Sequence, residues 1–453
     1  MYTPHTEHEI AAMLERIGVA SLDELMRVPE EVALRAPLSL PPALTEREIR
    51  SLFETYARRN EAVGYVSFLG AGAYRHYIPS VIPALAMRGE FLTAYTPYQA
   101  EVSQGYLQAI YEWQSYICML TGMEIANASV YDGATALAES VIMAVNATGR
   151  RRVLVSRAVH PNYRAVLAAY CDGIDVAIDE LPIGDDGRTE LTDLDERLAD
   201  HAHAAVVLQS PNVMGVLDPL PDERRASLAA SRTILIATVA EALSLGVLQP
   251  PAAWGAQIVA GEAQSFGIPL AYGGPYAGFI ATTAEHLRRI PGRLVGRTVD
   301  KDGRTAYVLT LQAREQHIRR EKASSNICTN QAHCALIATI YLAAMGATGL
   351  RNVAALNLER ARELSEAVCS VDGVRLRFSA PFFNEFVVDV GRPAAEVLDA
   401  LRERRILGGL DLGRFYPEYA TSILMTATEL TTRDEIAALR SALKEVVRPH
   451  VAA

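Results

Sequence analysis

Lysine is scarce in this chain of 453 amino acids. Its three lysines are Lys301, Lys322 and Lys444, so none occurs in the first 300 positions. The other 40 of its 43 basic residues are arginines, which means that positive charge is plentiful and the primary amine alone is scarce. Any chemistry that needs a lysine amine therefore has three candidate residues.

Cysteine is also scarce, and the spacing of the cysteines argues against a fold held by disulfides or by zinc. Five cysteines without a CxxC spacing give neither a disulfide framework nor a zinc site. The five are Cys118, Cys171, Cys328, Cys334 and Cys369. Cys328, His333 and Cys334 lie close enough in sequence to be read as metal ligands. We interpret them instead as part of a reduced, partly buried helix, and we expect no metal site.

Long apolar runs and blocks of like charge are missing as well. No stretch reaches about 18 apolar residues, and the first seven residues (MYTPHTE) lack the basic and apolar pattern of a secretory signal. The net charge of −10 is spread along the chain, which argues against nucleic acid or an anionic membrane as the main partner. We expect a soluble, cytoplasmic protein.

The composition and the hydrophobic spacing predict a helical arm followed by a large and a small domain. At 50% apolar and 21% charged residues, a chain of this length can bury a large core. Residues 1–100 form the arm and a loop region, with Ile10, Met13 and Ile17 on one helix face and Ser21 as an N-cap. Residues 101–313 form the large domain, and residues 314–453 form the small one.

Within the large domain, helices alternate with short apolar strands. This pattern predicts an α/β domain with a mostly parallel sheet covered on both faces, whose ligands bind beyond the carboxyl ends of the strands. The expected strands are 125–131, 152–156, 204–208, 233–237, 258–260 and 278–282, with helices at 104–119 and from 134. The small domain is expected to be α+β, with strands at 374–378, 384–390 and 422–426 and helices at 394–404 and 432–446.

Several polar residues follow the expected strand ends. Gly133, Ala134 and Thr135 open a helix after a strand, so their free N–H groups could cradle a phosphate. His160 could stack on a flat ring, and Asn212 could bond a ring oxygen. Glu241 could pair with a pyridinium nitrogen. Each residue also has a structural interpretation, as a helix cap or a loop residue.

Longer strings in the chain resemble a known family, the P-proteins of the glycine cleavage system, in their two-subunit form. The strings are 95–105 (YTPYQAEVSQG), 122–129 (GMEIANAS), 273–279 (GGPYAGF), 310–320 (TLQAREQHIRR) and 381–386 (PFFNEF). The resemblance spans nearly the whole chain, and it looks like subunit 1, the alpha subunit. It implies the fold of the fold-type I enzymes that use pyridoxal phosphate (PLP).

In the family's PLP-carrying subunit, a Schiff-base lysine lies in a His-Lys-Thr-Phe string shortly before a run of glycines and a proline. Here the matching string is 263–266 (AQSF), and counting back from Pro275 places Gln264 at the lysine. A carboxamide is not nucleophilic and forms no imine. The family's aspartate that pairs with the ring nitrogen is also replaced, by Glu241. We therefore expect this chain to bind no PLP covalently and to be inactive alone.

The resemblance implies a partner that holds the cofactor. That partner is a homologous beta subunit with PLP, in an alpha2beta2 heterotetramer that decarboxylates glycine and passes the aminomethyl group to the lipoyl arm of the H-protein. In related enzymes one subunit's loops reach into the other's pocket. The residues that we expect this chain to donate are Tyr95, Thr96, Pro97, Tyr98, Gln99, Arg319, Ser324, Ser325 and Asn326, with Arg320 assisting by charge.

Two alternatives remain open on the sequence. The first is a self-sufficient PLP enzyme, related to aminotransferases or desulfurases, that uses Lys322 or another site. The second is a purely structural scaffold that supports the beta subunit without touching its active site.

Overall fold

The chain divides into two units, Met1–Val63 and Gly64–Ala453. The structure is a computed structural model, and it describes residues 4–26, 28–29, 31–34, 36, 38–94, 97–327 and 330–447. The domain boundaries expected near residues 100 and 313 stay a prediction. Each unit is described by itself.

The first unit is helical, as the spacing of its apolar residues predicts. Its helices are α1 (Glu7–Ile17), α2 (Leu22–Leu25) and α3 (Glu46–Arg58). The Ser21 hydroxyl accepts a hydrogen bond from the Glu24 N–H at 3.4 Å, which confirms Ser21 as an N-cap. Thr45 and Glu48 form a reciprocal capping box at the start of α3. No described residue of this unit is buried, so its apolar side chains remain exposed.

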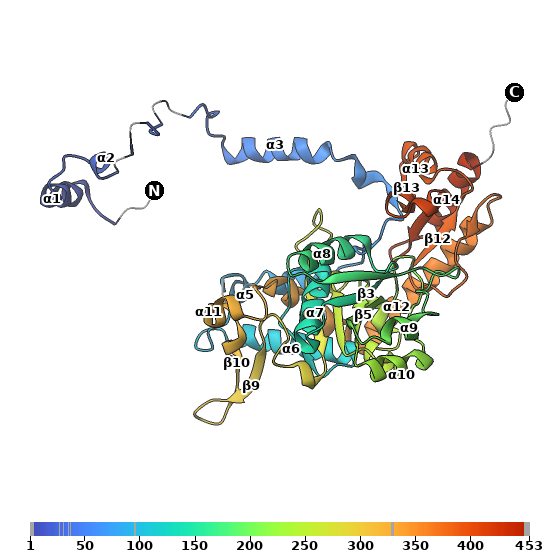
Figure 1. Cartoon of the computed structure of the whole chain (residues 1–453). Coiled ribbons are helices and arrows are strands. Elements are labelled where there is room, and N and C mark those ends of the chain that lie inside the picture. Colours follow the sequence, from blue (N-terminus) through green and yellow to red (C-terminus); the bar gives the residue numbers. More distant parts are fainter. Residues whose placement is uncertain are drawn as a thin grey trace. The chain divides into compact units, whose positions relative to one another are not determined.

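The second unit is built on a seven-stranded sheet in the order β2-β8-β7-β6-β5-β3-β4 (Figure 1). The strands are β2 (Ile125–Ala126), β3 (Arg152–Ser156), β4 (Ala177–Leu181), β5 (His203–Gln209), β6 (Ile234–Val239), β7 (Ile258–Glu262) and β8 (Gly278–Thr282). The five strands from β7 to β4 are parallel, whereas β8 is antiparallel to both β7 and β2. This confirms the mostly parallel sheet.

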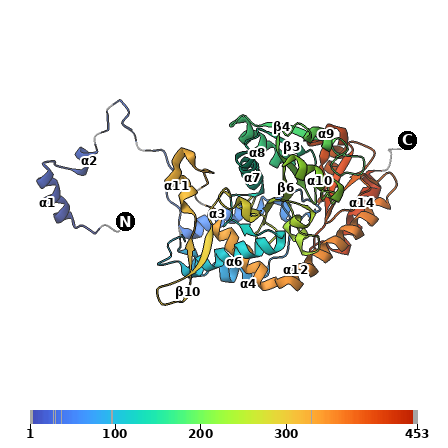
Figure 2. The same cartoon turned by 60° about the horizontal axis from the view of Figure 1, so that its bottom comes forward.

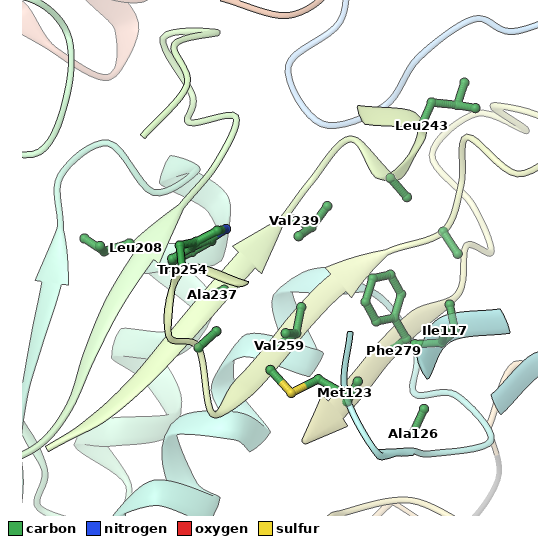
Figure 3. Packing of buried hydrophobic residues seen from close by; sticks show 14 of the residues in the cluster. Ile117, Met123, Ala126, Leu208, Ala237, Val239, Leu243, Trp254, Val259 and Phe279 are labelled. Carbon is green, nitrogen blue, oxygen red and sulfur yellow. The ribbon is translucent and has the colours of Figure 1, made fainter. Parts of the chain in front are cut away.

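Helices cover both faces of this sheet. Successive strand residues point to opposite faces, so apolar side chains on both faces need to be buried. In β5, Val206 packs in the core cluster that contains Trp113 of α6 and Tyr341 of α12. Its neighbour Val207 packs in the other cluster, with Leu137 of α7. The covering helices are α6 (Gln104–Thr121), α7 (Gly133–Thr148), α8 (Pro161–Asp172) and α12 (Ala332–Cys369). Figure 3 shows the first cluster, in which Phe279 of β8 and Trp254, from the turn before β7, are labelled.

One expected strand is shorter than predicted. Residues 125–131 were expected to form one strand, but β2 ends at Ala126, and only an isolated bridge between Val130 and Gly278 follows. Ser129 has φ of 121°, a conformation that interrupts an extended strand of L-residues. Asn127, before it, donates its backbone N–H to the Ile280 carbonyl, while its side chain accepts from the Ile280 N–H and donates to the Pro291 carbonyl.

The C-terminal part of the second unit contains a four-stranded antiparallel sheet in the order β11-β12-β15-β14, as the sequence predicts for an α+β region. Its strands are β11 (Arg375–Leu376), β12 (Glu385–Asp389), β14 (Leu410–Asp411) and β15 (Ser422–Thr426), and its helices are α13 (Ala394–Glu403) and α14 (Arg433–Val446). The expected helix at 394–404 and the expected helix at 432–446 are thus confirmed within a residue of each end. Figure 2 shows α12 running toward α14.

The remaining described elements are short. They include α4 (Val81–Ala86), α5 (Gly89–Leu92), α9 (Leu194–Leu198), α10 (Asp222–Ser231), α11 (Gln316–Arg319), the parallel pair β1 (Val66–Ser67) and β13 (Ile406–Leu407), and the hairpin β9 (Val295–Val299) and β10 (Thr305–Leu309). The sequence did not predict this hairpin.

Helix α12 is the one described helix long and apolar enough, by length and composition alone, to cross a membrane. It is interrupted at Gly346, where φ is 60° and ψ is −179°, so two helices meet at a kink that glycine accommodates. Its buried residues, such as Leu336 and Tyr341, belong to the core clusters of the second unit. These contacts account for its apolar composition.

Candidate active site

A pocket of about 330 Å³ opens at the carboxyl ends of the parallel strands, where the sequence places the ligand site. Ala134 and His160 are the two predicted site residues that line it. The other lining residues are Ala71, Gly72, Ala73, Tyr131, Asp132, Asn162, Tyr163, Glu262, Gly273, Pro275, Tyr276 and Gln331. The predicted residues Gly133, Thr135, Glu241 and Gln264 are buried and do not line it.

The expected phosphate cradle at the start of α7 is bonded to the chain's own carboxylates. The Gly133 N–H donates to Glu262 Oε2 at 2.9 Å, and the Thr135 N–H donates to Asp132 Oδ1 at 2.7 Å. Glycine is required at 133, because an added Cβ would lie 2.3 Å from the Tyr163 hydroxyl oxygen. Two of the three N–H groups expected to cradle a phosphate, those of Gly133 and Thr135, are therefore already bonded within the chain.

Glu262 is a site residue that the sequence interpretation missed. Its Oε1 accepts from the Gln264 and Ala277 N–H groups, both at 3.0 Å, in addition to the Gly133 bond. Burial raises the pKa of this carboxyl to about 7, although the backbone donors act in the opposite direction. Its signal in the sequence was a carboxylate at the end of an otherwise apolar strand.

Gln264 is 2% exposed, and its side-chain amide bonds only to backbone groups. Its Oε1 accepts from the Tyr74 N–H at 2.8 Å, while its Nε2 donates to the Tyr74 and Ile268 carbonyls at 3.0 and 2.8 Å. The amide thus forms two bonds across to Tyr74, in the pattern of a strand pair. A lysine could not reproduce this pattern, since its ammonium group has no acceptor.

Glu241 pairs with a histidine of the chain itself. His76 Nε2 lies 3.2 Å from Glu241 Oε2, and His76 Nδ1 lies 2.8 Å from Glu429 Oε2. Burial lowers the pKa of His76, but the two carboxylates outweigh it and raise this pKa to about 9. His76 is therefore an imidazolium between two carboxylates, and it takes the cationic role that a pyridinium would have beside Glu241.

His160 caps α8 and also bonds to Ala71. Its Nδ1 accepts from the Asn162 N–H at 3.2 Å, and its Nε2 lies 2.8 Å from the Ala71 carbonyl oxygen. Burial lowers the pKa of this imidazole, which fits the neutral tautomer with the proton on Nε2.

Asn212 lies away from the pocket in a tight loop. Its Oδ1 accepts from the Met214 and Val216 N–H groups, and its Nδ2 donates to the Gly187 carbonyl at 2.8 Å. A further bond joins Nδ2 to Asp218 at 3.2 Å. The structural interpretation of Asn212 as a loop residue therefore accounts for all its contacts.

Three of the predicted residues share one partner, the segment 71–76. Ala71 contacts His160, Tyr74 contacts Gln264, and His76 contacts Glu241. A buried glutamate, Glu385, anchors the same segment: it accepts from the Ala71 N–H and the Tyr74 hydroxyl, both at 2.7 Å. Three of the four strand-end residues, His160, Glu241 and Gln264, thus share this stretch of chain as a partner, whereas Asn212 does not.

The residues expected to serve the partner subunit differ in exposure. Tyr95 and Thr96 lie outside the described residues. The Tyr98 hydroxyl bonds to Asn330 Oδ1, and the Arg293 guanidinium lies 4.2 Å from the Tyr98 ring centroid. Of the other candidates, Pro97 is buried, Ser324 and Ser325 are half-buried, and Gln99, Arg319, Arg320 and Asn326 are exposed.

Comparisons of the sequence with known proteins identify the family. Residues 1–443 match the family described as glycine cleavage system P-protein. The chain is 49% identical over 437 residues to the probable glycine dehydrogenase (decarboxylating) subunit 1 of Geobacillus kaustophilus, covering 96% of each. It is 50% identical over 447 residues to the protein of the same name from Moorella thermoacetica, covering 98% of this chain and 99% of that one.

Solved structures give the fold. A crystal structure of glycine decarboxylase (P-protein) of the glycine cleavage system, in inhibitor-bound form, matches with a TM-score of 0.90 and 47% identity, covering 98% of this chain and all of that one. A glutamate decarboxylase from Lactobacillus brevis shares the fold at a TM-score of 0.67 and 14% identity, covering 93% of this chain and 98% of that one. The fold-type I architecture is thereby confirmed. The chain belongs to the family of glycine cleavage system P-proteins.

Proposed function

We propose that this chain is the alpha subunit, subunit 1, of a two-subunit glycine decarboxylase. The observation that carries the proposal is Gln264, whose buried amide forms three backbone hydrogen bonds at the position where the family resemblance places the Schiff-base lysine. Full-length relatives that bear the subunit 1 name support the assignment. In this proposal the chain is part of an enzyme and is inactive alone.

The residues of this chain do not fit PLP. An aldimine needs an amine, and Lys301, Lys322 and Lys444 are all exposed, away from the pocket. A phosphate needs free donors, and the Gly133 N–H is bonded to Glu262. We infer that the beta subunit holds the cofactor.

The chain's own contribution is to shape the partner's pocket. Tyr98 is held by Arg293 and Asn330, so its position is fixed before any partner binds. The Asn326 amide and the Arg319 guanidinium are exposed, and together they suit the oxygens of an anionic group. These features favour a role at the active site over that of a scaffold. They also disfavour a self-sufficient enzyme that uses Lys322.

The wider assembly follows from the same proposal. We infer an alpha2beta2 heterotetramer in the cytoplasm that decarboxylates glycine and delivers the aminomethyl group to the lipoyl arm of the H-protein. The exposed apolar side chains of the first unit support association with other subunits, because a monomer seldom exposes so many.

The test is to replace Tyr98 by Phe and Asn326 by Ala, separately, and to assay glycine decarboxylation by the complex reconstituted with the beta subunit. We expect each change to lower kcat/KM by about tenfold or more, while assembly measured by sedimentation stays intact. Tyr170→Phe, on α8, is the matched control for loss of a phenol hydroxyl. Full activity of both variants would leave the scaffold interpretation in place.

A further inference from the structure

A second and larger pocket lies at the opposite edge of the sheet, at the amino ends of the parallel strands. Its volume is about 630 Å³. Thr233 and Ile234 at the start of β6 and Gln257 before β7 form its floor, and Leu228 and Ala229 of α10 form one wall. Because the candidate active site lies at the carboxyl ends, the two pockets are separated by the length of the strands.

The walls of this pocket concentrate positive charge. Arg150, Arg225, Arg232 and Arg289 line it, and Glu285 is its one acidic side chain. This excess of three positive charges stands out in a chain whose net charge is −10. Such a concentration in a concave site attracts anions.

Not all of these arginines are committed to the protein. Arg150 donates to the carbonyls of His203, Ser231 and Arg232, so its guanidinium serves mainly to join strand ends. Arg225 pairs through Nη2 with Asp222 at 2.6 Å, but its Nε finds no partner among the described residues. Arg232 and Arg289 are exposed at the rim.

His286 provides an independent observation. It lines the pocket and is 3% exposed, yet both of its ring nitrogens lack a hydrogen-bond partner in the described part of the chain. A buried polar group without a partner costs about 1–3 kcal/mol. A buried polar group without a protein partner is commonly satisfied by a ligand, an ion or an ordered water.

We propose that this pocket binds a metabolite-sized anion, with its phosphate or carboxylate groups on Arg225, Arg232 and Arg289 and a polar group on His286. Guanidinium groups match both head groups, since each presents paired oxygens to the N–H donors. The volume is ample for a small organic molecule and exceeds the need of a single inorganic ion. The proposal is independent of the function proposed above, because it involves none of the same residues.

The test uses the full-length chain and two probes, pyrophosphate and citrate, titrated by calorimetry at matched ionic strength. We expect saturable binding of at least one probe, and the tighter probe identifies the head group. Arg225→Ala and Arg289→Ala should each weaken binding about tenfold, and His286→Phe should weaken it several-fold. Arg224→Ala is the matched control, because Arg224 belongs to the same helix and pairs with Asp195 outside the pocket.

Two results would overturn the proposal. One is the absence of saturable binding for both probes. The other is a loss of affinity in Arg224→Ala equal to that in Arg225→Ala, which would indicate a diffuse charge effect. Circular dichroism of each variant checks that the chain is folded before it is titrated.

Discussion

At the scale of single residues, Gln264 has a structural role in the buried site. Its amide completes hydrogen bonds with Tyr74 and Ile268 that a lysine amine cannot complete. The neighbouring Glu262 similarly accepts a hydrogen bond from the Gly133 N–H at the start of α7. Restoring one amine would therefore not restore a cofactor pocket.

We predict that Gln264→Lys, purified and incubated with PLP, stays colourless and gains no absorbance that borohydride fixes. The variant should be less stable by about 2–4 kcal/mol, because Tyr74 loses its acceptor and an amine is buried. Denaturant unfolding measures the loss. Gln264→Met, which also lacks the amide, is the control and should be destabilised to a similar extent. A yellow, reducible variant would contradict the prediction.

His76 gives a second prediction, on pH. Its pKa in the folded chain is raised to about 9, so the folded state binds its proton more tightly than the unfolded state does. The stabilisation is complete below about pH 6.5 and is lost as pH rises through 9. Unfolding free energies of the wild type should fall by up to about 3 kcal/mol across this window beyond any fall seen in His76→Gln. Parallel profiles for the two proteins would refute the assignment.

At the scale of elements, α7 connects the candidate site to the loop expected to reach the partner. Glu139 on α7 is 3% exposed, its Oε2 lacks a partner among the described residues, and it bonds to Ser325. Burial raises the pKa of this carboxyl to about 7. Burial thus favours the protonated carboxyl of Glu139, whereas the hydrogen bond to Ser325 lowers its pKa and favours the carboxylate.

The corresponding prediction concerns Glu139→Gln. Because the folded-state pKa is raised, the stabilisation from protonated Glu139 is present at low pH and is lost as pH rises through about 7. Glutamine cannot ionise, so the variant should match the wild type near pH 5 and exceed its stability by about 1–3 kcal/mol at pH 8. Urea unfolding at both pH values measures this. Glu366→Gln, at an exposed position of α12, should change neither value.

At the scale of the whole molecule, the first unit contrasts with the second. Its helix α3 carries Ile49, Leu52, Phe53 and Tyr56 on one stripe, and all four are exposed. The second unit buries continuous clusters on both faces of its sheet. We infer that this apolar stripe serves as a contact surface for another subunit.

We predict that Phe53→Glu weakens association with the beta subunit by at least about tenfold in sedimentation experiments. The unfolding free energy of the isolated chain should stay within about 0.5 kcal/mol, because Phe53 is exposed in it. Glu54→Gln, on the neighbouring polar face, should leave association unchanged. A large loss of stability in the isolated chain would show that the stripe packs within it.

Much of the architecture was predictable, because it depends on local patterns. The apolar runs of β5 and β6 and the cap at Ser21 depend on residues that are neighbours in the sequence. The strand expected at 125–131 failed because one residue, Ser129, adopts a positive φ that no local pattern signals. The hairpin β9–β10 was missed.

The sequence by itself determined the mostly parallel sheet, the helical first unit and the absence of a lysine at position 264. These depend on residue identity and on spacing along the chain. Only the tertiary structure decided what the site residues contact, because Ala71, Tyr74 and His76 meet partners up to 353 positions away. Glu262 accepts from backbone N–H groups, and His76 lies between two carboxylates. Buried donors and charges require partners, and the fold supplies these partners from distant parts of the chain.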